Sequence, residues 1–493
     1  MKRTIPFAGL LADLPDLGNP GMTQADNCVW SDGTYKPLLS LSVSGDALTA
    51  RCQGAFAGRD ADGNTVLYAG DATKLYQRSG SSWTDKSGAT YTTQSIQYWK
   101  FRQFGSLVIA TNFADTPQKI TIGGVGTYSD LTGAPNAYHI GVINNFVVLG
   151  NTEDATDGHV PYRVRWSAIG DAEDWPTLGT TDASDKQSDK EDLNSNYGRV
   201  QAITDGDQYG LVFQETGITR FTYVGGTAIF EVDTFERARG LYGPFSYAQV
   251  GNEVIFLARN GFYRTDGVNV ESIGIGSVDS LVLDSIDTNY PERVTTSIDF
   301  SNKLIYFSYP DTSATSGTPN KLVIYNYVEN KWTTGSETVE LVFSSKSLGY
   351  TLDELDSVSA SIDDLPASLD SPVWTGGNPL SGGFDTDHKL GSFNGSAKTA
   401  TLDTSEASLN AGGLAYVDGV RPLVEGGTAT VALLTRNLQS DSQTASSAVS
   451  LNSRTGLANF RSSARYHAAR ISIAGGFTNA FGADFIFSPA GEV

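Results

Sequence analysis

The sequence is poor in cysteine and histidine, and it has no long hydrophobic run. Two cysteines, Cys28 and Cys52, in 493 residues cannot form a disulfide framework or, alone, a zinc knuckle. We expect two small buried thiols in a protein made in reducing cytosol. No two of the four histidines lie within five residues of each other, so the spacings of zinc hydrolases do not occur. No run of about 18 apolar residues is found, so the sequence predicts no membrane span. No long apolar stretch follows the charged start at residues 1–6, so no secretory signal is expected.

Positive charge is also scarce. Lysine and arginine number 34 against 55 acidic residues, which gives a formal charge of −21. This balance argues against a basic face that grips nucleic acid through its phosphates. The charge is uneven: residues 171–192 and 351–370 each carry net −6, whereas residues 421–470 carry net +4. The sequence therefore predicts two acidic loops and one arginine-rich face.

Short β-type runs separated by Gly, Asn, Asp and Ser recur along most of the chain. Such a run begins at Val66, Leu107, Phe146, Leu211, Val254 and Leu304, mostly about 40–50 residues apart. A hairpin pattern accompanies this period, with Tyr76 seven residues before Trp83 and Tyr325 seven before Trp332. Several short strands per unit at this period are typical of propeller blades. We predict an all-β protein with a β-propeller of six or seven blades; a generic antiparallel meander is the alternative.

The composition divides the chain into four parts. Residues 1–50, broken by proline and glycine, are expected to form an extended N-terminal arm. Residues 51–350 would form the propeller, with the acidic stretch 171–192 as a solvated insertion and a short helix capped by Ser277. Residues 351–370 read as an acidic linker. The rest, 371–493, is expected to be a β-rich, β-sandwich-like domain, part of which could complete the propeller.

The sequence contains no catalytic spacing. Both the G-x-S-x-G elbow and the G-x-x-x-x-G-K-[ST] phosphate loop are missing, so we predict no enzyme, no cofactor and no metal site. Two alternatives stay open. The abundant carboxylates leave room for a propeller glycosidase, and four aromatic residues could stack on sugars in a carbohydrate- or receptor-binding propeller. These four are Trp83, Tyr98, Trp99 and Trp332.

Several stretches, taken in order, resemble one family. Residues 15–21 read PDLGNPG and are followed by YKP at 35–37. Residues 163–167 read RVRWS, closed by Gly170-Asp171 and Asp174-Trp175, and WTGG stands at 374–377. This order is similar to that of the tail nozzle, or tail tube B, proteins of short-tailed bacteriophages, which overlap with "DNA stabilisation" tail hub proteins. The resemblance spans most of the chain, although no single motif is specific to the family.

The resemblance implies a structural subunit of the virion tail, made and assembled in the host cytoplasm. Such proteins form a six-fold ring of propeller subunits that binds an adaptor or gatekeeper ring and encloses the DNA exit channel, so that the genome is retained and then ejected. The partners would be further copies of this chain, the adaptor ring, and tail fibres or tip proteins. DNA would be a passenger rather than a ligand, because an acidic lumen repels phosphate. No membrane anchor is expected.

Two sets of residues are candidates for these contacts. Candidates for subunit or partner interfaces come from the arm, the RVRWS segment with its nearby tryptophan, and the arginine-rich face. They are Pro15, Asp16, Asn19, Pro20, Tyr35, Pro37, Arg163, Arg165, Trp166, Trp175, Arg461, Arg465 and Arg470. For Trp166, a place in a blade core is an equal alternative. The acidic insertion supplies the candidates for lining the DNA channel. They are Asp171, Glu173, Asp174, Asp182, Asp185, Asp189, Glu191 and Asp192.

Overall fold

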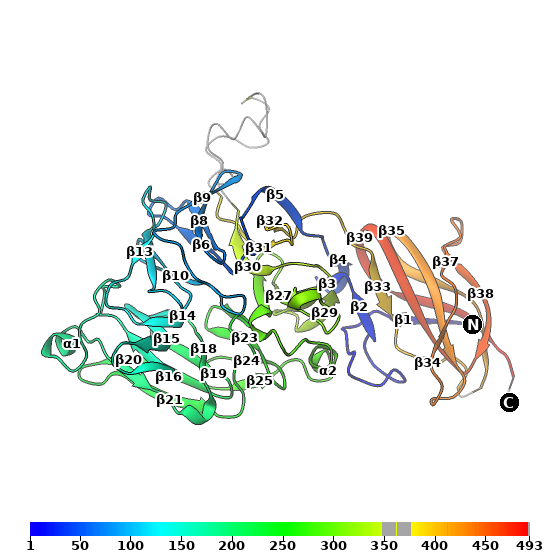
Figure 1. The fold of residues 1–493 in the computed structure, drawn as a ribbon. Coiled ribbons are helices and arrows are strands. Elements are labelled where there is room, and N and C mark those ends of the chain that lie inside the picture. Colours follow the sequence, from blue (N-terminus) through cyan, green and yellow to red (C-terminus); the bar gives the residue numbers. More distant parts are fainter. Residues whose placement is uncertain (348–360, 362–375, 412, 492–493) are drawn as a thin grey trace.

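The computed structural model describes residues 1–347, 361, 376–411 and 413–491. Nearly all regular structure in these residues is β, as predicted, and it forms two bodies that lie side by side (Figure 1). A β-propeller occupies one end, and a curled sheet built largely from the C-terminal residues occupies the other. The predicted acidic linker, 351–370, lies outside the described residues except for Ser361.

The propeller consists of four-stranded antiparallel blades whose first strands gather around a common axis. Within the described residues, six blades are separate sheets and a seventh four-stranded unit extends into the C-terminal sheet, so the predicted six- or seven-bladed propeller is confirmed. The first three separate blades are β6 (Gly54–Arg59), β7 (Thr65–Gly70), β8 (Leu75–Ser79) and β9 (Ser82–Asp85); β10 (Lys100–Phe104), β11 (Leu107–Thr111), β12 (Gln118–Thr121) and β13 (Ser129–Asp130); and β14 (Asn136–Ile143), β15 (Phe146–Asp154), β16 (Gly158–Trp166) and β17 (Lys190–Asp192).

The remaining units continue the ring in chain order. They are β18 (Val200–Ile203), β19 (Tyr209–Gln214), β20 (Ile218–Gly225) and β21 (Ile229–Glu236); β22 (Tyr247–Val250), β23 (Glu253–Ala258), β24 (Gly261–Thr265) and β25 (Val270–Ser272); the extended unit β26 (Thr295–Asp299), β27 (Leu304–Tyr309), β28 (Lys321–Asn326) and β29 (Lys331–Gly335); and the closing blade β30 (Leu341–Lys346), β31 (Pro379–Phe384), β32 (Lys389–Ser392) and β5 (Ser42–Ala47).

The closing blade joins distant parts of the chain. Its outer strand β5 pairs antiparallel with β32, as in the pair Lys389 and Ala47. Residues beyond the expected linker therefore complete the circle, one of the two arrangements left open above. The second strands of the blades are nearly continuous apolar runs, as in β27, because each blade is covered by a neighbour on both faces.

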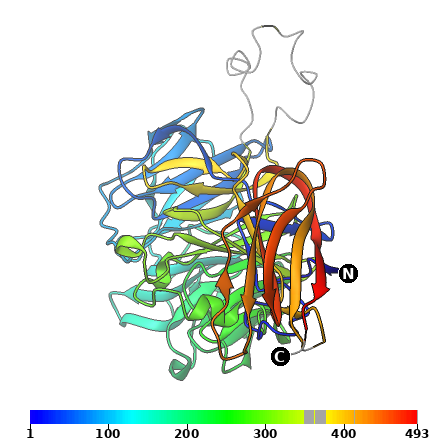
Figure 2. The same cartoon turned by 90° about the vertical axis from the view of Figure 1, so that its right-hand side faces the viewer.

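The C-terminal body is one sheet that curls on itself (Figure 2), rather than two stacked sheets. Two long antiparallel strands, β35 (Ala415–Arg436) and β39 (Tyr466–Pro489), pair along their length, with register shifts after Val417 and between Leu423 and Thr428. Shorter strands of this body are β33 (Ala400–Asp403), β34 (Ala407–Ser408), β36 (Thr444–Ala445), β37 (Val449–Ser450) and β38 (Ala458–Ala464).

The N-terminal arm packs against the propeller and the C-terminal body of the same chain. Its strands are β1 (Lys2–Pro6), β2 (Gln24–Asp26), β3 (Cys28–Ser31) and β4 (Thr34–Pro37). β1 pairs with β39, and β2 lies between propeller strand β29 and β33 of the C-terminal body, so one 15-stranded sheet runs through both bodies. Four apolar residues of this arm, Ile5, Phe7, Leu10 and Met22, are buried in the shared core. Cys28 and Cys52 are free and buried, as predicted.

The helices are short. α2 (Asp279–Leu283) falls where a helix was predicted, but Ser277 does not cap it. Instead, the carboxylate of Asp13 accepts hydrogen bonds from the backbone N–H groups of Ser280 and Leu281, at 2.9 and 3.0 Å. α1 (Thr181–Asp185) was not predicted. No helix among the described residues is both long enough and apolar enough to span a membrane.

Candidate functional site

The RVRWS segment lies on β16 and is largely internal. Arg163 is buried, and its guanidinium donates to Asp192 on the neighbouring strand β17 at 2.6 Å and also to Asp157. The hydrogen bonds to Asp192 and Asp157 raise the pKa of Arg163. The guanidinium of Arg165, also buried, lies over the ring of Trp175. Arg163 is therefore tied into its own blade by ion pairs, whereas Nε of Arg165 has no hydrogen-bond partner among the described residues, and both side chains are buried.

The two tryptophans predicted as interface residues belong to cores. Trp166 is 3% exposed, packs in the core between the third and fourth blades, and donates its indole N–H to the backbone oxygen of Gln187. Trp175 is 7% exposed, packs with Ala172 and donates to its backbone oxygen. The charged sequence around them folds back onto the blade instead of projecting from it, so both side chains are buried within the subunit, and their place at an interface stays a prediction.

The acidic insertion forms the outer edge of the third blade. It contains α1 and β17, at the end of the molecule farthest from the C-terminal body (Figure 1). Seven of its eight acidic candidates are exposed and Asp174 is half-buried. Several carry ion pairs: Lys186 bridges Asp174 and Asp182, and Glu173 pairs with Lys119. These carboxylates do not face the axis of the propeller; whether they line the channel of a ring stays a prediction.

The arm candidates divide into buried and exposed residues. Tyr35 is fully buried, and its hydroxyl donates to the backbone oxygen of Ala8 at 2.6 Å. Asn19 is also buried and holds the arm's turn through the backbone of Leu11 and Gly21. These two residues shape the arm from inside. The others remain accessible: Pro15 and Pro20 are exposed, and Asp16 and Pro37 are half-buried.

The arginine-rich face is partly neutralised by residues just before it. Arg470 forms an ion pair with Asp403 at 2.7 Å, on the paired strand β33. Glu406, which is buried, pairs in the same way with Arg436 at 2.7 Å. Arg461 is exposed and Arg465 half-buried. The surplus of positive charge counted in the sequence is therefore smaller on the surface.

The aromatic residues considered for sugar stacking are mostly inside the blades. Trp99 is 1% exposed and Trp332 is 2% exposed. Tyr98 is buried, while Trp83 is half-buried against Phe384. Because a sugar needs an open aromatic face, Trp99, Trp332 and Tyr98 are not stacking platforms in this structure.

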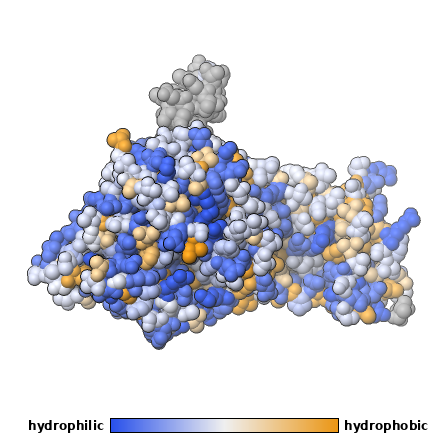
Figure 3. All heavy atoms as spheres, in the orientation of Figure 1, coloured by the Kyte–Doolittle hydropathy of each residue, from blue (hydrophilic) through white to orange (hydrophobic). Residues whose placement is uncertain are grey.

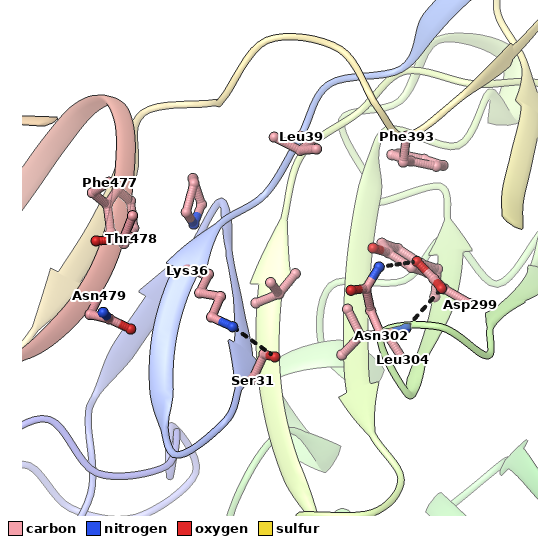
Figure 4. Close-up of a pocket in the computed structure, with 13 residues that line it drawn as sticks. Ser31, Lys36, Leu39, Asp299, Asn302, Leu304, Phe393, Phe477, Thr478 and Asn479 are labelled. Atoms are coloured by element: carbon pink, nitrogen blue, oxygen red, sulfur yellow. Dashed lines mark hydrogen bonds between the residues drawn. The ribbon is translucent and has the colours of Figure 1, made fainter. Parts of the chain in front are cut away.

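One cavity lies at the joint between the two bodies (Figure 4). It has a volume of about 540 Å³ and is lined from β4, from the β26–β27 turn and from the bend in β39 around Phe477. Lys36 points into it but is held by Asp32 and Ser31. Across the cavity, the ring of Tyr306 stacks on Phe393, with centroids 5.1 Å apart. The arm and the C-terminal strand thus meet the propeller here through mixed polar and apolar walls.

A second cavity, also of about 540 Å³, lies on the propeller axis. It is lined by five of the first strands, β6, β10, β22, β26 and β30, and by Asp205, which follows the first strand β18. Phe56, Phe101 and Phe343 supply aromatic walls. Beside the cavity, the ring of Phe245, which lines it, meets the ring of Tyr98 edge to face at 5.0 Å.

Charged side chains converge on this axial cavity. Arg102 donates to Asp205 at 2.9 Å and to the hydroxyl of Tyr247 at 2.9 Å. The Lys100 ammonium donates to the backbone oxygen of Pro244 at 2.5 Å and lies 3.5 Å from the centre of the Phe245 ring. Lys346 lines the wall at the end of β30. Three cations therefore face one carboxylate, in a chain whose overall charge is strongly negative.

Sequence reasoning missed this cavity. The only local signal is the alternation of Lys100 and Arg102 within the strand KFRQF, which places two cations on one face of a strand. Nothing in the sequence indicates that this face meets Asp205 and Lys346. Within the described residues, no three histidine, cysteine or acidic side chains gather as metal ligands.

Comparison with known proteins gives no assignment: no protein-family model matches the chain, and no curated protein sequence matches it significantly.

Proposed function

We propose that this chain is a non-enzymatic structural subunit of a short-tailed phage tail, which assembles into a ring enclosing the DNA exit channel and binds an adaptor or gatekeeper ring. The ordered motifs described above suggest this role. The sheet that runs through both the propeller and the C-terminal body is consistent with it, because a subunit under mechanical load must keep its two bodies in fixed positions. At this joint the indole of Trp30 and the backbone of Asp32 donate to Glu329 of the propeller, at 2.7 and 2.8 Å.

The observation that carries the proposal is an apolar patch beside the arm motif. Leu14, Ile275 and Leu281 are 38%, 75% and 41% exposed, and we call them the arm–α2 patch. They lie near one another, because Asp13 accepts hydrogen bonds from the backbone of Ser280 and Leu281 and the side chain of Leu14 lies beside Gly276. Figure 3 shows one face of the molecule, on which polar and apolar groups are mixed. Exposed neighbouring leucines and isoleucines are typical of an interaction surface.

The partner proposed for this patch is a second copy of the chain. Copies that each carry −21 repel one another at long range, so their contact needs an uncharged surface. In such a ring the exposed carboxylates of residues 171–192 would face the channel and keep DNA mobile. An image of the ring with these carboxylates on its outer wall would contradict this part of the proposal.

Native mass spectrometry of the purified chain tests the ring, alongside images of tails labelled with an antibody against the chain. We expect an oligomer, with six copies as the leading stoichiometry. The double variant Leu14→Asp/Leu281→Asp should dissociate it, whereas Val125→Asp, at a position 99% exposed on another blade, should not. The proposal would be refuted if the chain were strictly monomeric and the antibody labelled no tail.

A further inference from the structure

We propose that the axial cavity of the propeller binds a small organic anion with an aromatic or apolar body, its negative group held by Lys100. This site is independent of the proposed ring, because it lies within one subunit. Its volume of about 540 Å³ falls in the usual range for small-molecule sites, roughly 300–1,000 Å³. Its position on the axis brings side chains from six blades together.

The main evidence is the state of Lys100. The residue is 5% exposed, and no carboxylate of the described residues lies within ion-pair distance of its ammonium group. Among the described residues its ammonium has one hydrogen-bond acceptor, the neutral backbone oxygen of Pro244, and otherwise faces aromatic rings, of which Phe245 is the nearest. A buried charge without a counterion is costly. An anion in the cavity would supply that counterion.

Neighbouring charges strengthen the argument. Asp205, the carboxylate that lines the cavity, is already engaged by Arg102. Burial, together with the Arg102 guanidinium, holds the pKa of Lys100 well below its usual range, and a bound anion would act in the opposite direction by favouring the charged ammonium. Lys346 has no ion pair with any described residue and adds a further cation to the wall. The local field therefore favours an anion over a neutral or cationic ligand.

The aromatic walls indicate the rest of the ligand. The rings of Phe56 and Phe101 stack with their centroids 6.4 Å apart, and Phe300, which is 43% exposed, stands at the rim. Aromatic side chains favour flat apolar groups through stacking and edge-to-face contact. Lys100 lies over one such ring, that of Phe245. An aromatic carboxylate combines both requirements.

The test uses 4-(trifluoromethyl)benzoate as probe and fluorine NMR of the full chain. We expect saturable binding that weakens about ten- to hundredfold in Lys100→Met, which keeps the length of the side chain but removes the charge. Lys346→Met, at the rim, should weaken it to a smaller extent. Lys389→Met, a lysine of the closing blade outside the cavity, is the matched control and should bind the probe as the wild type does.

Two further ligands separate the features of the site. The neutral amide of the probe should bind at least about tenfold more weakly, because it lacks the charge. Inorganic phosphate should compete at least about tenfold less well than the probe, because it lacks the ring. The proposal is overturned if the wild type does not bind the probe, or if Lys100→Met binds it as tightly as Lys346→Met does. It is also overturned if the amide or phosphate binds the wild type as tightly as the probe does.

Discussion

Acidification should destabilise the C-terminal body through a single buried histidine, His467. It lies on β39 opposite Thr435, is fully buried, and has no hydrogen-bond partner on either ring nitrogen within the described residues. Burial lowers the pKa of His467 from 6.5 to about 4, against a small opposing effect of Glu406. The unfolded chain binds a proton near pH 6.5, whereas the folded chain does so only near pH 4. The contribution of neutral His467 to the free energy of unfolding is therefore present above pH 6.5 and is lost as the pH falls toward 4.

The size of the effect follows from the two pKa values. A difference of about 2.5 units corresponds to about 3 kcal/mol of unfolding free energy once the pH is below 4. Between pH 7 and pH 5 the loss is about 2 kcal/mol. The variant His467→Leu cannot take up this proton. Relative to the wild type, its free energy of unfolding should therefore rise by about 2 kcal/mol over that interval.

Urea unfolding of both proteins at pH 7 and pH 5 measures this difference, because all other titrating groups are common to the two chains. A second non-titrating variant, His467→Gln, packs differently but should show the same pH-dependent difference. If the gap between variant and wild type did not change with pH, the reasoning about His467 would be refuted.

Two further predictions concern buried or capping charges. Arg436→Met leaves the Glu406 carboxylate buried without its ion-pair partner, so the free energy of unfolding, measured in urea, should fall by about 3–5 kcal/mol. A double variant that also carries Glu406→Leu should recover much of this loss. An unchanged free energy of unfolding in the single variant would contradict the role of the pair. Asp13→Ala removes the cap of α2 and should lower the free energy of unfolding by about 0.5–2 kcal/mol. Amide hydrogen exchange should become faster at Ser280 and Leu281 and stay unchanged in β35. Faster exchange throughout the chain would argue against a local cap.

The propeller could be predicted from the sequence because its signal repeats. Each blade recurs at a similar spacing, and aromatic pairs such as Tyr325 and Trp332 mark the same hairpin, so the pattern survives variation in any one copy. Closure of the ring carries no such signal. β5 and β32 pair once, across most of the chain, and only the fold makes them neighbours.

The sites were less predictable, because charge in a sequence does not tell whether a residue is exposed. Trp175 stands among acidic residues yet is buried, since Arg165 covers it and Ala172 packs beside it. The axial cavity is the opposite case. Lys100 and Asp205 belong to different blades, and their convergence depends on the radial arrangement of first strands rather than on any local motif.

The use of β5 as the last strand of the ring has a consequence for synthesis. The ribosome makes β5 more than 300 residues before its partner β32. At ordinary translation rates that interval lasts roughly 20–70 s. The strands of the arm likewise wait for β33 and β39. Through most of its translation the nascent chain therefore carries unpaired N-terminal strands. A prematurely terminated product would keep these unpaired strand edges, which can pair with another chain and aggregate.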